Sequence, residues 1–238
     1  MTFKKPLLSL TLASGLGTSA LFFASAVAPT NDNLDDWKNY ENQRLDEMQG
    51  VFNASTINAW KEHFAKINDV NQIEIQDTLL TDLYNSVSKL KNALIENVAI
   101  QTTDSYLKAT DVQKQVYDRE KAPAETLLNK ILNDALVPSA DFNTVSLQTL
   151  LNDTVNKTWQ QTLINLENAV KALPQVADTS LKGKAKTVLE QWTTLTGAEK
   201  TRYVNKLAFL PRNAEQDAVN KVVDNAFKTA KAGLLELC

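Results

Sequence analysis

The stretch from Leu181 to Ala232 constrains the fold most, because its apolar residues recur every three or four positions and two capping motifs divide it into three parts. Spacings of three and four place side chains on one face of an α-helix. One motif is Thr196–Glu199, which has the S/T-x-x-E form of a capping box, and the other is Asn213 followed by Gln216. Pro211 ends the middle helix, since its ring disfavours a helical conformation at the preceding residue. Three short helices with short connections bury their apolar faces most simply as an antiparallel three-helix bundle.

The same spacing recurs along most of the chain and predicts an all-α fold. Glycine and proline are rare, with six of each in 238 residues, and leucine, alanine, lysine and glutamine are abundant. We expect helices over residues 34–48, 57–67, 73–100, 106–132 and 145–173. Ser55 or Thr56 is expected to cap the second of these helices. Pro123 is expected to kink the fourth or to start a new helix after Ala122, because a proline inside a helix costs about 3 kcal/mol.

These helices group into three units along the chain. The expected units are residues 34–94, 95–174 and 180–233, with the helix over 73–100 shared between the first two. Residues 55–67 and 195–207 share a cap and a hydrophobic pattern at an offset of about 140 residues, as an internal repeat would. A chance match between two amphipathic helices is the alternative, because such patterns are common.

The first 28 residues have the layout of a secretory signal peptide. Lys4 and Lys5 precede an uncharged run and a series of small residues. Cleavage after Ala26 is our preferred site, and cleavage after Ala28 also satisfies the small-x-small rule. The alternative is an uncleaved membrane anchor, since the run is about as long as the ~20 residues that a spanning helix requires. Both readings place the rest of the chain outside the cytoplasm.

Charge and cysteine content exclude several classes of protein. Without Lys4 and Lys5, 23 of the 25 basic side chains remain against 28 acidic ones, a formal charge of −5, which argues against a nucleic-acid partner. Cys238 is the single cysteine, so the chain forms no internal disulfide. An intermolecular disulfide through Cys238 and truncation of a longer reading frame are both open at this point.

Two segments resemble known modules. The run from Tyr106 to Leu128, with its Tyr-Asp pair and later Ala-Glu-x-Leu-Leu, resembles the FIVAR module, and Trp159–Leu173 resembles the closing helix of that module. Lys184–Ala232, with its Leu-Thr-x-x-Glu-Lys turn and Val-x-x-Val third helix, resembles the GA module. GA and FIVAR modules alternate in the very large matrix-binding surface proteins of staphylococci and in related proteins of other Firmicutes and mycoplasmas.

The resemblance implies tandem three-helix bundles that long helices join into an elongated rod. It also implies display at the cell surface and binding of host proteins such as albumin or fibronectin. GA modules that bind albumin use their second and third helices, which gives a candidate albumin-binding face. Carried over by position, that face consists of Thr201, Tyr203, Val204, Lys206, Leu207, Arg212, Asn213, Ala214, Asp217 and Asn220. The turn at Leu210–Asn213 is longer than the family's usual turn, and Pro123 is foreign to the FIVAR helix.

Catalysis finds no support in the sequence, so we expect no enzyme, cofactor or metal site. His63 is the single histidine and forms no recognisable triad or multi-histidine metal site. Trp37, Trp60, Trp159 and Trp192 fall on or beside the inward faces of their helices, which predicts burial. The sequence leaves two functions open: an adhesin-like binding protein, and a helical spacer of the cell envelope with no host ligand.

Overall fold

A computed structural model describes residues 27–30, 33–134, 136 and 142–235 of the chain. Helices account for nearly all regular structure in these residues, and the all-α prediction is confirmed. The expected signal segment and Cys238 lie outside the described residues. No helix in the described part is long and apolar enough to cross a membrane.

The first half of the described chain forms three helices and a short connection. They are α1 (Leu34–Glu47), α2 (Ala54–Lys66) and α3 (Val70–Val98), and the 3₁₀ turn η1 (Ala99–Thr102) and the one-turn helix α4 (Asp104–Leu107) follow. The middle contains α5 (Asp111–Asn133), α6 (Thr144–Thr149), the π-helical stretch η2 (Leu150–Trp159) and α7 (Gln160–Lys171). The C-terminal bundle consists of α8 (Leu181–Gln191), α9 (Gly197–Ala208) and α10 (Gln216–Leu235).

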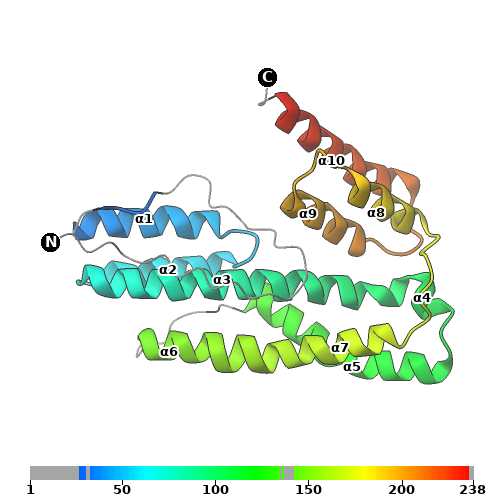
Figure 1. Cartoon of the computed structure of the whole chain (residues 1–238), viewed down its shortest axis with the longest axis horizontal. Coiled ribbons are helices and arrows are strands. Elements are labelled where there is room, and N and C mark those ends of the chain that lie inside the picture. Colours follow the sequence, from blue (N-terminus) through cyan, green and yellow to red (C-terminus); the bar gives the residue numbers. More distant parts are fainter. Residues whose placement is uncertain (1–26, 31–32, 135, 137–141, 236–238) are drawn as a thin grey trace.

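The 29-residue helix α3 is the element on which the others pack. At 1.5 Å per residue it extends about 43 Å. Figure 1 shows α1 and the C-terminal bundle on one side of α3, over its first and second halves, and α5 to α7 on the other side. Contacts of α3 with α1, α5, α7 and α9 confirm this arrangement.

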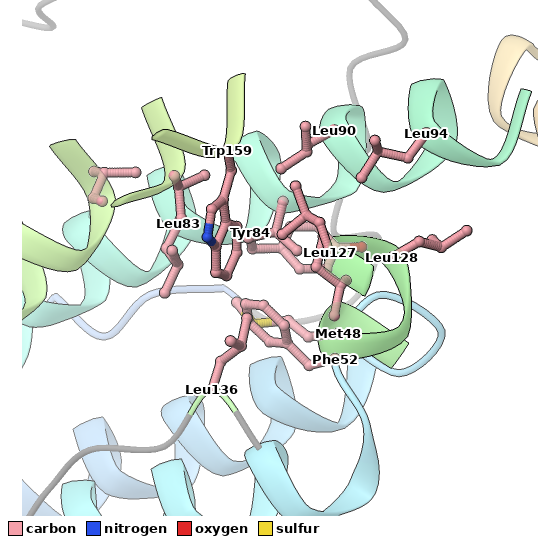
Figure 2. Close-up of a cluster of buried hydrophobic side chains, with 14 of the residues drawn as sticks. Met48, Phe52, Leu83, Tyr84, Leu90, Leu94, Leu127, Leu128, Leu136 and Trp159 are labelled. Atoms are coloured by element: carbon pink, nitrogen blue, oxygen red, sulfur yellow. The ribbon is translucent and has the colours of Figure 1, made fainter. Parts of the chain in front are cut away.

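One apolar core connects the two units that the sequence divides near residue 94. A single cluster of buried side chains extends from Trp37 to Leu173. Figure 2 shows part of it, where Met48 and Phe52 after α1, Tyr84 on α3 and Trp159 at the end of η2 gather with leucines of α3 and α5. A second, separate cluster lies within the C-terminal bundle. The division into tandem bundles stays a prediction, and its first two units share their core.

Polar contacts also join the end of α5 to α2. The indole Nε1–H of Trp60 donates to the Leu136 carbonyl at 3.0 Å, and the Leu136 N–H donates to Thr56 Oγ1 at 2.8 Å. The N-cap of α2 is Asn53, whose Oδ1 accepts from the Thr56 N–H at 2.8 Å. The expected cap at Ser55 or Thr56 was therefore wrong, and the Thr56 hydroxyl instead binds the chain after α5.

The expected helix over 145–173 forms, but its middle is wound as a π-helix. Its first inward residues are spaced by four, whereas an α-helix turns every 3.6 residues, so such a row drifts around an α-helix. The wider i→i+5 turn offsets that drift and keeps the row facing the core. The buried residues of the row are Leu147, Leu151, Val155, Trp159 and Leu163.

Two further boundaries differ from expectation and one is confirmed. Helix α5 runs without interruption through Pro123, so no new helix starts after Ala122. Helix α10 begins at Gln216, too late for Asn213 to cap it. The capping box of α9 forms as predicted, with the Thr196 hydroxyl and the Glu199 carboxylate each accepting from the other's backbone N–H.

Candidate binding site

The C-terminal bundle has a small core in which Tyr203 is central. Its ring is 3% exposed, and its hydroxyl contacts the Asn225 carbonyl at 3.1 Å and Thr229 Oγ1 at 2.6 Å on α10. Lys206 and Arg202 lie over the ring with their charged groups 5.2 and 5.7 Å from its centroid. Tyr203 therefore links α9 to α10, and little of its side-chain surface is accessible to a partner.

The ten residues of the candidate albumin-binding face do not form one exposed surface. Tyr203, Val204, Leu207 and Ala214 are buried, and Thr201 and Arg212 are half-buried. Lys206, Asn213, Asp217 and Asn220 are exposed. The accessible part of the predicted face is thus one lysine on α9 and three polar residues before and within the first half of α10.

Val204 and Leu207 lie where the second half of α9 approaches α3, and Leu207 also belongs to the core of the C-terminal bundle. The amide of Asn205 donates to Asn92 Oδ1 on α3 at 2.8 Å. Val204 and Leu207 line a cavity of about 60 Å³ beside Ile100 at the end of α3. No local sequence pattern indicates this contact, since α9 is amphipathic with or without α3 beneath it.

An ion-pair cluster anchors the turn before α10 to the start of α4 and to the linker before α8. The Arg212 guanidinium contacts the Asp104 carboxylate and lies 3.0 Å from Asp178 Oδ1. Thr179 donates to Asp104 Oδ2 from its hydroxyl at 2.6 Å and from its N–H at 2.9 Å. These two hydrogen bonds, and then the guanidinium, lower the pKa of Asp104 to about 2. Arg212, expected on a binding face, instead holds the bundle in place.

Two lysines of α8 add to this junction. Lys182 is 5% exposed and donates to Thr102 Oγ1 at 2.8 Å and to the Leu210 carbonyl at 2.7 Å, and its burial lowers its pKa. Lys186 lies 2.7 Å from Glu96 on α3. Charged and polar groups thus join the bundle to α3, η1 and α4, in addition to the packing of α9 on α3.

The other residues singled out in the sequence have structural positions. Trp37, Trp60 and Trp159 are buried as predicted, and Trp192 is half-buried with its ring 6.3 Å from that of Phe227. His63 Nε2 lies 2.6 Å from Gln76 Oε1, and its ring contacts three aromatic rings, those of Trp60, Phe64 and Phe142. Within the described ranges no group of His, Cys, Asp and Glu could hold a metal ion.

A larger hollow lies beside the packed part of α9. It occupies about 740 Å³ between the first half of α9, the middle of α3 and the turn after α1, and we call it the central cleft. Lys89, Lys91, Arg202 and Phe209 are among its lining residues. The sequence could not reveal it, because it exists only where two distant segments face each other.

Comparisons with known proteins give one distant similarity. The chain is 25% identical over 219 residues to the Extracellular matrix-binding protein ebh of Staphylococcus aureus (strain MW2). The match covers 88% of this chain and 2% of the staphylococcal protein, so the chain spans a small fraction of that relative. No protein-family model matches the chain, and no solved structure matches it significantly.

Proposed function

We propose that the chain is an exported, surface-associated bacterial binding protein, adhesin-like and without enzymatic activity, whose helical modules bind host serum or matrix proteins such as albumin or fibronectin. The observation that carries the proposal is the similarity to a matrix-binding protein along most of the chain. The GA-like and FIVAR-like patterns and the signal-like N-terminus support it. The described fold suits such a role, since helices bound in a common core present their outer faces rigidly.

The face proposed for an albumin-type ligand is the accessible part of the predicted one: Lys206, Asn213, Asp217 and Asn220. All four are exposed, and packing against Tyr203 holds Lys206 in position. The buried Val204 and Leu207 belong to such a face only if the bundle leaves α3. The structure therefore favours a polar contact surface over an apolar one.

Binding of the exported chain (residues 27–238) to immobilised albumin, fibronectin and whole serum tests the proposal. We expect saturable binding at micromolar concentration, and Lys206→Ala to weaken it. Lys228→Ala, at an exposed lysine of α10, is the matched control. Tyr203→Ala is unsuitable because it empties the bundle core. Absence of binding to all three at micromolar concentration would refute the proposal.

A helical spacer without a host ligand is the second candidate. Its specific support is the shared core from Trp37 to Leu173 together with the ion-paired junction, because both stiffen the chain without serving a ligand. A spacer is indifferent to Lys206→Ala and binds none of the three preparations. The binding experiment therefore separates the two functions.

Export and dimerisation are further parts of the proposal. We propose that the N-terminal segment directs export, and that Cys238 can link two chains through a disulfide. N-terminal sequencing of the secreted chain should begin at Val27 or Pro29, and a chain that retains Lys4 is an uncleaved anchor. Electrophoresis without reductant should show a dimer that Cys238→Ser abolishes, and a monomer in both chains would contradict the disulfide.

A further inference from the structure

The central cleft carries positively charged side chains, although the net charge of the protein is negative. Lys89, Lys91 and Arg202 line it, and none of them has a carboxylate partner among the residues that the structure describes. The one acidic side chain of the lining, Glu199, accepts from the N–H and hydroxyl of Thr196 at 2.8 and 2.9 Å as part of the α9 cap. Clustered cations without counterions attract anionic ligands, and walls of low dielectric strengthen that field.

The floor and rim of the cleft are apolar. Tyr84 and Ile95 lie in the floor, each 5% exposed, and belong to the core beneath α3. Phe209 lies at the rim and is 64% exposed, although removing a phenylalanine ring from water is favourable. A ligand that covers Phe209 gains this energy, so the cleft suits an anion that also carries apolar groups.

Amide side chains also line the cleft. The hydrogen bond from Asn205 to Asn92 uses the Asn92 oxygen, which leaves the Asn92 amino group and the Asn205 oxygen for a ligand. Asn85, half-buried in the same wall, adds a donor and an acceptor. Paired donors and acceptors of this kind match the alternating N–H and C=O groups of an extended peptide.

We infer that the central cleft binds an extended acidic peptide segment of a partner protein. The peptide carboxylates pair with Lys89 and Arg202, its backbone bonds to Asn92 and Asn205, and an apolar side chain covers Phe209. The inference rests on the proposed function, for which it names a site and the chemistry of the recognised segment. A sulfated polysaccharide shares the anionic charge but has no apolar side chain for the floor and rim.

A random heptapeptide library displayed on phage, selected on the immobilised exported chain, tests the inference. We expect the selected peptides to be enriched in Asp and Glu and to carry at least one large apolar residue. The double variant Lys89→Glu/Arg202→Glu should reverse this preference toward Lys and Arg. The matched control Lys228→Glu/Lys231→Glu, on exposed lysines of α10, should retain the acidic preference.

Fluorescence anisotropy with the best selected peptide then measures the site directly. Lys89→Gln should weaken binding up to about fivefold, since Lys89 is exposed and an exposed ion pair contributes at most about 1 kcal/mol. Far-UV circular dichroism checks that each variant is folded. Selection of no peptides, an unchanged preference in the reversed variant, or tighter binding of a heparin oligosaccharide than of the peptide overturns the inference.

The outcomes of this experiment and of the serum experiment are separable. Acidic peptides that bind the cleft, with no binding of albumin, fibronectin or serum, would refute the proposed ligands and leave the peptide site standing. Serum binding that survives Lys89→Glu/Arg202→Glu, with no peptide selected, would refute the cleft alone.

Discussion

The body of the protein (residues 34–173) and the C-terminal bundle are both helical, but different interactions hold them together. Large side chains such as Trp60 and Phe64 fill the body, whose core is continuous across three groups of helices. The bundle core is small, with four alanines among its nine buried residues, and ion pairs and lysine hydrogen bonds join it to α3, η1 and α4. Polar contacts between units separate more readily than apolar ones. We therefore expect the bundle to detach from α3 under conditions that leave the body folded.

The largest effect is expected inside the body. Trp60→Ala should lower the free energy of unfolding by about 3–5 kcal/mol, because it leaves a large cavity and removes the hydrogen bond to the Leu136 carbonyl. Urea denaturation followed by circular dichroism measures the change. Phe227→Ala, at a 59% exposed ring of the bundle, is the control, and its effect should be well below 1 kcal/mol. Equal losses in the two variants would contradict the difference between the regions.

The next effect is a pH dependence that belongs to the body. Burial raises the pKa of Glu41 on α1 to about 7, although Arg44 lies 4.0 Å away and opposes the shift. Arg44 in turn contacts Asp77 on α3. The folded state therefore holds a proton that the unfolded state loses near pH 4.5, so stability is highest below about pH 4.5 and falls as the pH rises to about 7.

Glu41→Gln should remove this dependence and stabilise the body at pH 8 by about 2–3 kcal/mol, since each pKa unit corresponds to about 1.4 kcal/mol. Urea denaturation between pH 4.5 and pH 8 provides the measurement. The exposed Glu62→Gln should leave the pH profile unchanged. A Glu41→Gln chain whose stability still falls over this range would show that another group is responsible.

A smaller effect is expected at the close approach of α8 to the linker before it. A Cβ added at Gly183 would lie 2.5 Å from the Asp178 Cγ and 2.6 Å from the Asp178 carbonyl oxygen. Gly183→Ala should therefore displace the linker and destabilise the bundle by about 1–3 kcal/mol. Thermal unfolding by calorimetry should show the bundle transition lowered and the body transition unchanged. Gly50→Ala is the contrasting variant in the body, where the positive φ of 91° and not a clash opposes alanine.

Local sequence signals predicted the helices well. The spacing of apolar residues located every long helix, and the capping box at Thr196 fixed the start of α9, because both depend on residues within a few positions of each other. The errors at Asn53 and Gln216 are errors of cap choice, where several polar residues compete for the same role. The π-helical winding of η2 follows from packing of the whole row against α3 and could not be read from propensity.

The candidate site was predicted less well, because it depends on contacts between distant segments. Tyr203 and Leu207 were carried over onto a binding face by the family resemblance, but both lie in the bundle core, where Tyr203 bonds to α10. Arg212 carried no local sign that Asp104, more than a hundred residues earlier, would be its partner. The central cleft could not be predicted from local sequence either, since Lys89 and Arg202 come together only in the folded chain.

The smallest effect on overall stability, and the sharpest separation of the two regions, is expected at the ion-pair junction. The pKa of Asp104 is lowered to about 2, so its contribution is complete above about pH 4 and is lost as the pH falls toward 2. Acid should therefore release the bundle over this range, where Glu41 keeps its proton and its contribution to the stability of the body is unchanged. Arg212→Gln should produce the same release at pH 7, because it takes the guanidinium away from both Asp104 and Asp178.

Hydrogen exchange resolved by mass spectrometry should show faster exchange in α8 and α9 with no change in α3 residues 80–94. Faster exchange that spreads through α3 would mean that bundle and body unfold as one unit, and the distinction between them would fail.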